Sequence, residues 1–167
     1  DTTPIKIGWI GPLTGDAASL GQDALKASQL AVEEVNEAGG VNGRKLELVI
    51  EDTKCNAKEA SLAGNKLITF DRVPVVLGGA CSGETMAAAP LAEQNKVVLF
   101  SYCSTAASVT SAGDYVFRSL PSDNFQARFV AEYMYNTLGQ RQVAVLAMLG
   151  NWGGGLKQAF TARFSEL

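Results

Sequence analysis

The chain has 167 residues, of which 47% are hydrophobic and 19% are charged; this balance suits one folded domain and excludes a disordered chain. The net charge of −3 argues against the basic surface that nucleic-acid binding needs. The sequence has no histidine, which excludes nucleophile pairs and zinc sites that depend on imidazole.

Short apolar runs alternate with stretches of helical periodicity along the whole chain. The first run is Ile5–Ile10, and after a turn-rich loop at 12–21 a helical pattern continues to Gly39–Gly40, where glycine is typical of a helix end. Further strands are predicted at 46–50, 74–77, 97–100, 115–117 and 142–149. Further helices are predicted at 57–70, 84–94, 124–138 and 156–167. This alternation predicts an α/β fold, with a parallel sheet that carries helices on both faces.

A domain boundary is predicted at Arg118–Asp123, where polar residues and a proline lie between two strand–helix stretches. In an open parallel sheet, ligands bind at the carboxyl ends of the strands. Because those ends share one edge, this rule selects four loops as candidate binding segments. They are residues 11–21, 79–85, 101–106 and 150–155.

The loop at 79–85 is rich in small residues and opens a predicted helix. Backbone amides at a helix N-terminus bind anions, so a carboxylate or a phosphate would suit this segment. The alternative is that Ser82 only caps the helix. The segment lacks the lysine of a phosphate-binding P-loop and the flanking glycines of a nucleophile elbow.

Hydroxyl groups gather in the next loop, Ser101–Ala106, which also contains Cys103. Together with Ser82 on the adjacent strand end, these groups could form a polar cradle, or alternatively an ordinary turn. Trp152 lies in the glycine-rich segment 150–155, which we expect to be a mobile loop. The indole of Trp152 either packs within the protein or binds a ligand.

Three cysteines occur, at 55, 81 and 103, without a CxxC motif. That excludes a four-cysteine metal cluster and a dithiol redox motif. Two interpretations remain open: three buried thiols, or one disulfide with one spare thiol in an exported protein.

Several motifs resemble, in order and spacing, the type I periplasmic solute-binding proteins, and more closely the branched-chain amino-acid binding proteins of ABC importers. The similarity covers essentially the whole chain. The motifs are Gly11–Gly15, Leu30–Asn36, Gly39–Arg44, Glu51–Asp52, Gly78–Ser82, Ser119–Asp123 and Trp152–Leu156.

The resemblance implies roles for individual residues. Ser82 corresponds to the serine that binds the ligand α-carboxylate, and Ser104 and Thr105 to the pair that holds the α-carboxylate and α-ammonium. Trp152 stands where a tyrosine usually closes over the ligand, and Leu20 where some members have a tyrosine; Cys103 lies beside this set. The resemblance also implies a disulfide between Cys55 and Cys81, with Cys103 free.

The resemblance also implies a fold of two similar lobes that close over the ligand. We expect residues 1–120 to belong to the first lobe and 121–167 to begin the second, in a piece of a longer protein. As a piece it would bind ligand weakly and could associate through the exposed edges of strand 142–149, whereas the complete protein would be a monomer. No metal, cofactor or catalytic residue is implied. The expected location is periplasmic or extracellular, with or without a lipid anchor, and the expected partners are a small carboxylate ligand and a transporter permease.

Two alternatives remain open. The same fold serves as the sensor domain of a receptor. An enzyme on a flavodoxin-like or Rossmann-like sheet would have Asp52 and Glu84 as acid–base groups, although a helix cap or a strand-end loop carboxylate is the favoured interpretation of both residues.

Overall fold

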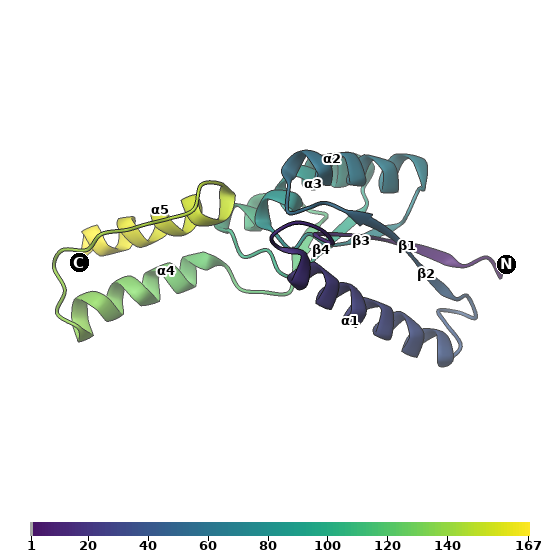
Figure 1. The fold of residues 1–167 in the computed structure, drawn as a ribbon, viewed down its shortest axis with the longest axis horizontal. Coiled ribbons are helices and arrows are strands. Elements are labelled where there is room, and N and C mark those ends of the chain that lie inside the picture. Colours follow the sequence, from purple (N-terminus) through teal and green to yellow (C-terminus); the bar gives the residue numbers. More distant parts are fainter. Residues whose placement is uncertain (1) are drawn as a thin grey trace.

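A computed structural model describes residues 2–167 (Figure 1). Five strands form one sheet in the order β2–β1–β3–β4–β5, and every neighbouring pair is parallel. The strands are β1 (Ile5–Gly11), β2 (Leu46–Asp52), β3 (Val75–Leu77), β4 (Val98–Ser101) and β5 (Val116–Arg118). The parallel sheet and these five strand positions confirm the sequence-based prediction.

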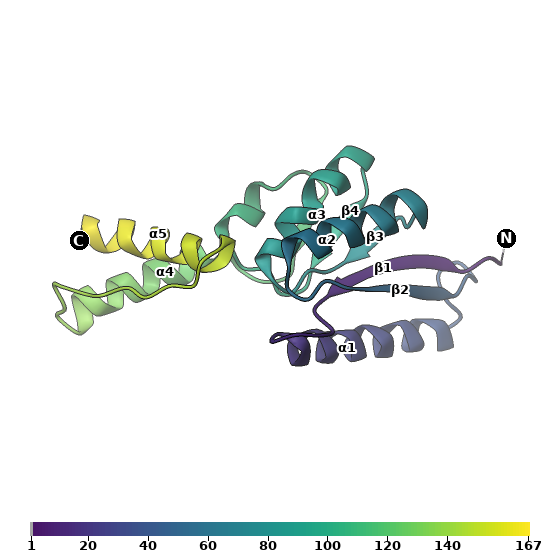
Figure 2. The ribbon, with the colours of Figure 1, turned by 45° about the horizontal axis from the view of Figure 1, so that its top comes forward.

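Helices cover both faces of this sheet, as predicted. The main helices of the chain are α1 (Ala18–Glu37), α2 (Ala57–Asn65), α3 (Ser82–Asn95), α4 (Asp123–Glu132) and α5 (Asn151–Glu166). Helix α1 lies on one face, while α2 and α3 cover the other (Figure 2). Shorter turns extend α2 and α4, namely η1 (Lys66–Phe70) and η3 (Tyr133–Thr137), and η2 (Ala107–Ser111) precedes β5.

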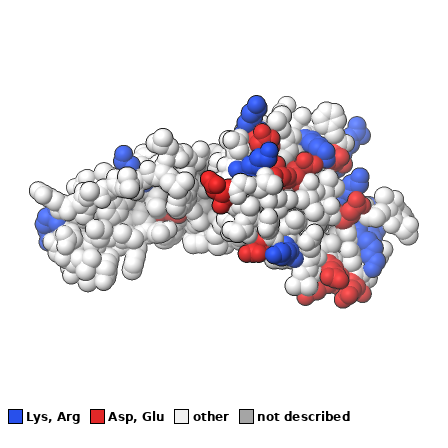
Figure 3. All heavy atoms as spheres, viewed as in Figure 1, with Lys and Arg blue, Asp and Glu red and all other residues white. Residues whose placement is uncertain are grey.

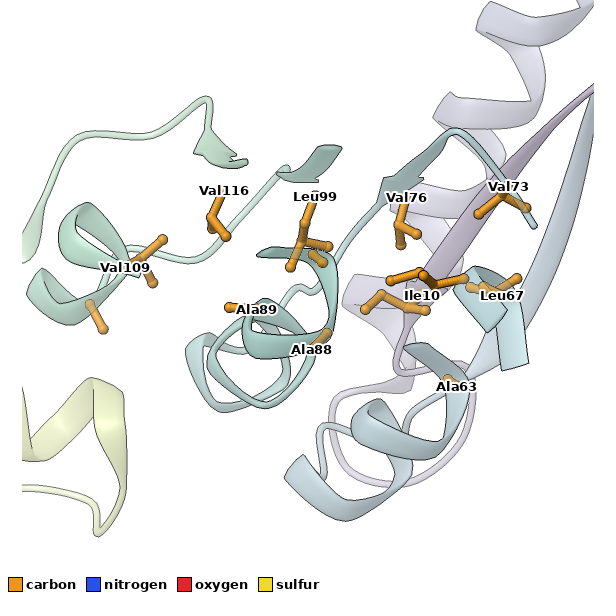
Figure 4. Packing of buried hydrophobic residues seen from close by; sticks show 13 residues of the cluster. Ile10, Ala63, Leu67, Val73, Val76, Ala88, Ala89, Leu99, Val109 and Val116 are labelled. Carbon is orange, nitrogen blue, oxygen red and sulfur yellow. The ribbon is translucent and has the colours of Figure 1, made fainter. Parts of the chain in front are cut away.

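The hydrophobic core lies between the sheet and the α2–α3 layer. Val76 and Leu99 point from β3 and β4 toward Ala88 and Ala89 on α3 (Figure 4). These side chains are all at most 2% exposed. Because alanine side chains are small, α3 can approach the strands closely, which fixes where its N-terminus lies at the strand ends.

Helices α4 and α5 pair into a hairpin that extends away from the sheet (Figures 1 and 2). The Arg163 guanidinium binds the Glu132 carboxylate at 2.8 Å, and Phe164 packs edge-on against Tyr135. In the view of Figure 3 this end of the molecule carries few charged atoms, whereas acidic and basic groups are interspersed around the sheet. No helix in residues 2–167 has the length and apolarity needed to cross a membrane.

The prediction of a strand at 142–149 is wrong, because this segment forms no regular structure. A strand needs hydrogen bonds to a neighbouring strand, and within residues 2–167 the sheet ends at β5. Leu146 and Leu149 are fully exposed. The apolar pattern of the segment is therefore that of a buried strand, but no strand within the described residues pairs with it.

The prediction of a mobile loop at 150–155 is also wrong, because α5 begins at Asn151. Gly153 is buried, and a Cβ atom there would lie 2.3 Å from the carbonyl oxygen of Met148. This glycine thus permits a close approach between the helix start and the preceding chain. Gly153 therefore serves close packing of the backbone and not backbone mobility.

Candidate functional site: a cleft at the strand ends

A cleft of about 720 Å³ lies between the carboxyl ends of the strands and the start of α5. All four loops selected from the sequence contribute to it. Their contributions are Leu20, Ala80–Gly83, Cys103, Thr105 and Gly150–Gly153. The set of residues proposed from the sequence is therefore brought together, with the exception of the Ser104 side chain.

Ser82 is the first residue of α3 and is 4% exposed. Its Oγ accepts a hydrogen bond from the Ala106 N–H at 3.2 Å. A hydroxyl has one proton to donate, so Ser82, which lines the cleft, is still able to donate its own proton. The N–H groups of Ser82 and Gly83, the first of α3, have no acceptor within the helix, whereas the next two donate to the Cys81 carbonyl. Hydroxyl and amides together make this wall suited to an anion.

Thr105 lies in the loop after β4, directly before the Ala106 that contacts Ser82, and it is hydrogen-bonded to Asp123. The Thr105 hydroxyl donates to the Asp123 carboxylate (Oγ1–Oδ2 3.0 Å), and the Asp123 N–H donates to the Thr105 carbonyl at 2.9 Å. Arg118 donates to the carbonyls of Thr105 and Ala106 at 3.0 and 2.8 Å. The loop is therefore fixed by residues from the end of β5 and the start of α4.

Ser104 is fully buried and does not line the cleft. Its Oγ donates to the Gly79 carbonyl at 3.1 Å and shares a hydrogen bond of 2.8 Å with the Thr85 hydroxyl. Ser101 Oγ donates to the same carbonyl at 2.8 Å. These hydroxyls hold the loops after β3 and β4 together, so the hydroxyl of Ser104 is occupied inside the protein.

The remaining walls are mostly apolar. Leu20 and Trp152 are 45% and 44% exposed and line the cleft from α1 and from α5. Cys103 is partly buried, and this burial raises the pKa of its thiol. A less ionised thiol behaves as a small apolar group.

Cys55 and Cys81 form a disulfide, with Cα atoms 5.5 Å apart, and Cys103 is free. This confirms the pairing implied by the resemblance. Since Cys81 directly precedes Ser82, the disulfide fixes the start of α3 to the loop that follows β2.

Asp52 and Glu84 do not line the cleft. Glu84 is fully buried; its carboxylate accepts hydrogen bonds from the Thr53 hydroxyl and from the Cys81 N–H at 2.8 Å. Asp52 accepts from the N–H groups of Leu13 and Lys54 at 2.8 and 3.0 Å. Both carboxylates therefore shape the loops around the cleft.

Asp52 should make stability depend on pH. Burial raises the pKa of Asp52, but hydrogen bonds from the Thr14 hydroxyl and from nearby N–H groups outweigh it, so the pKa lies below its ordinary value of 3.8. A carboxyl group whose pKa is lower in the folded than in the unfolded state stabilises the fold fully at pH values above its unfolded-state pKa. This stabilisation is lost as the pH falls through the folded-state pKa. Asp52→Ala should therefore cost about 1 kcal/mol at pH 7, allowing for solvent screening, and less below about pH 4.

Urea unfolding at pH 7 and pH 3 measures this difference. Asp23→Ala is the matched control, because Asp23 is exposed on α1 and pairs with Lys26 at 3.4 Å; we expect it to change stability little at either pH. An equal cost of Asp52→Ala at both pH values would contradict the prediction.

Sequence reasoning missed part of the cleft, including Leu120, Asp123, Gln126 and Met148. The rule about strand ends would have found Asp123 if applied to the short strand before it, since Asp123 is only the fifth residue after the end of β5. Met148 had no such signal, because it lies in the segment that was predicted to be a strand.

Comparison with known proteins places the chain in a family. Residues 4–167 match the family model described as "Periplasmic binding protein", and the chain belongs to this family. Its members are substrate-binding proteins rather than enzymes, and the family is extracytoplasmic. 

Individual relatives are similar over nearly the whole chain. The leucine-, isoleucine-, valine-, threonine- and alanine-binding protein of Pseudomonas aeruginosa is 35% identical, over 91% of this chain and 41% of the relative. The substrate-binding protein LivJ of Streptococcus pneumoniae, solved with isoleucine, is 32% identical with a TM-score of 0.86, over 96% of this chain and 47% of that one.

A third relative holds a different kind of ligand. A solute-binding protein of Rhodopseudomonas palustris, solved with 3,4-dihydroxybenzoic acid, is 26% identical with a TM-score of 0.86, over 99% of this chain and 45% of that one. This chain therefore spans less than half the length of each of these relatives.

Proposed function

We propose that this chain is the N-terminal part of an extracytoplasmic solute-binding protein that captures a small amino acid or a related carboxylate for an ABC importer and does not turn it over. The observation that carries the proposal is the cleft in which the Ser82 wall faces apolar groups from α1 and α5. Such a mixture of a few placed polar groups and apolar walls is typical of small-molecule sites. The named ligands of the relatives, amino acids and an aromatic acid, share a carboxylate.

The carboxylate would bind at the N-terminus of α3. The Ser82 hydroxyl and the helix amides supply donors there, and the helix dipole adds favourable electrostatics. No lysine or arginine lines the cleft within residues 2–167. Neutral donors would therefore balance the negative charge of the ligand.

We further propose that residues 1–120 belong to a first lobe and 121–167 begin a second. The exposed apolar residues of the hairpin support this, because Phe125, Phe129, Leu146 and Leu149 are each at least 69% exposed. Apolar surface on this scale is expected where further polypeptide packs. In the full-length protein, closure of the second lobe would bring Trp152 over the ligand and exclude water.

An importer partner would be a permease that recognises the closed form, and the full-length protein would act as a monomer. A sensor domain of a receptor would use the same cleft with a different partner.

Replacing Ser82 tests the proposed function. In the full-length protein, Ser82→Ala should weaken binding of the ligand by about 1–3 kcal/mol, or roughly 5- to 150-fold in Kd, because a buried carboxylate loses a donor. Calorimetric titration against a panel of amino acids and carboxylates first identifies the ligand and then measures the loss.

Ser108→Ala is the matched control. Ser108 is an exposed serine of η2 outside the cleft, so its removal should leave the affinity unchanged. If Ser82→Ala bound as tightly as the unmodified protein, Ser82 would be a structural residue only. If no panel member bound the unmodified protein, the proposed function itself would fail.

A further inference from the structure

We propose that Cys103 and the Cys55–Cys81 disulfide form a site of thiol–disulfide exchange in the wall of the cleft. In this exchange the sulfur of Cys103 bonds to that of Cys81, and Cys55 becomes the free thiol. The inference goes beyond the proposed function, because it concerns the three cysteines alone and does not depend on which solute the cleft holds.

All three cysteines line the same cleft. They lie in the loops that follow β2, β3 and β4, whose carboxyl ends share one edge of the parallel sheet. The disulfide joins the first two of these loops, with Cα atoms 5.5 Å apart, and Cys103 in the third is a free thiol that is only partly buried. The nucleophile and the disulfide that exchange chemistry requires are therefore gathered around one cavity.

Hydrogen bonds on both sides of Cys81 hold its loop against the loop that follows β4. On one side, the Gly79 carbonyl accepts from the Ser104 hydroxyl at 3.1 Å. On the other side, Ser82 Oγ accepts from the Ala106 N–H at 3.2 Å. The loop that carries the free thiol thus contacts the chain on either side of Cys81, which makes the sulfur of Cys81 the one that is attacked.

The exchange is balanced without an oxidant or a reductant. Cys103 gives its proton to the solvent, and the resulting thiolate attacks Cys81 Sγ. The Cys81–Cys103 bond forms as the Cys55–Cys81 bond breaks, and Cys55 leaves as a thiolate that takes up a proton from water. One disulfide and one thiol are present before and after, so the step is an isomerisation.

Cys55 is suited to be the leaving group. It is exposed, so water can solvate its thiolate. Lys54 and Cys55 have φ values of 53° and 56°, a left-handed backbone conformation that residues other than glycine seldom adopt. Once the bond to Cys81 is broken, this segment is free to take up a more favourable conformation. Release of Cys55 therefore relieves backbone strain.

The exchange changes how the cleft is held together. In the starting form the disulfide ties the start of α3 to the loop after β2. In the exchanged form it ties the start of α3 to the loop after β4. Because Cys81 directly precedes Ser82, the cross-link beside this wall of the cleft is replaced, and the free thiol moves from a partly buried residue to an exposed one.

Site-specific alkylation tests the exchange in the full-length protein. Trypsin cleaves after lysine and arginine, so the three cysteines fall on three peptides, 55–58, 73–96 and 97–118. The protein is kept folded at pH 8.5, then unfolded at pH 6 with N-ethylmaleimide to block free thiols, and digested without reduction. We expect part of the maleimide label to move from peptide 97–118 to peptide 55–58, and a disulfide between 73–96 and 97–118 to appear. The rate should be independent of protein concentration.

Cys103→Ser is the matched control for the alkylation. It keeps the starting disulfide but lacks the attacking thiol, so peptide 55–58 should stay unlabelled.

Two further variants measure which cysteine the free thiol reaches. Cys55→Ser leaves Cys81 and Cys103 as thiols, whereas Cys81→Ser leaves Cys55 and Cys103. In a buffer of reduced and oxidised glutathione, we expect the disulfide of the first variant to have an equilibrium constant about tenfold or more larger, because contact between two loops raises the effective concentration of their thiols.

Each outcome decides one part of the inference. A label that stayed on peptide 97–118 would overturn the exchange site. A disulfide between 55–58 and 97–118 in place of the expected one, or equal constants for the two variants, would overturn Cys81 as the sulfur attacked. A rate that rose with protein concentration would show exchange between molecules and overturn exchange within one cleft. All these results are independent of solute binding, so the proposed function is tested separately.

Discussion

Glu84→Ala is expected to destabilise the chain by about 3 kcal/mol. Glu84 is fully buried, and its carboxylate accepts hydrogen bonds from the Thr53 hydroxyl and the Cys81 N–H. Alanine would leave both donors buried without a partner, at about 1–3 kcal/mol each in general, and would open a cavity. The loss of the cap at the start of α3 adds to this cost. Chemical unfolding at pH 7 measures the difference.

Glu84→Gln is the matched variant. Its side-chain oxygen can accept from the Cys81 N–H while its amide donates to the Thr53 hydroxyl, which is able to accept. We therefore expect glutamine to restore most of the lost stability. If alanine and glutamine cost the same, the effect would come from the charge of Glu84 rather than from its hydrogen bonds.

The second large effect concerns the disulfide. The double variant Cys55→Ala/Cys81→Ala should lose about 3.5 kcal/mol, the chain-entropy value for closing a loop with a sequence separation of 26 residues. Many domains have a total stability of only about 5–15 kcal/mol, so this loss should lower the unfolding midpoint strongly.

Cys103→Ser serves as the control, because Cys103 takes no part in the disulfide and is only partly buried, so its replacement should cost less than the loss of the disulfide. Thiol counting on the denatured, unreduced protein should find one free thiol. A count of three, or an unchanged stability of the double variant, would contradict the prediction.

The sequence was informative where one local pattern decided the structure. The runs at 5–10 and 46–50 became paired strands because their neighbours in the sheet are present. The small residues of 79–85 correctly marked a helix start at a strand end. The same reasoning failed for 142–149, since an apolar pattern predicts burial but cannot show whether a pairing strand is available.

The direction in which a side chain points was the other feature that the sequence did not predict. Ser104 and Thr105 are adjacent in the sequence, and both were proposed for the ligand. The structure turns Ser104 inward to Thr85 and Gly79, and turns Thr105 toward the cleft and Asp123. Composition gives no sign of this division. It depends on the contacts between loops that are far apart along the chain.

The placement of the two tryptophans has an optical consequence. Trp9 is fully buried, stacks on Tyr102 and donates its indole N–H to Ser28, whereas Trp152 is 44% exposed in the wall of the cleft. A buried indole keeps its surroundings when the cleft fills, so Trp9 contributes a constant emission. Trp152 alone would move from water into contact with a ligand. Trp152 is therefore placed to report occupancy of the cleft through a change in tryptophan emission, without an attached dye.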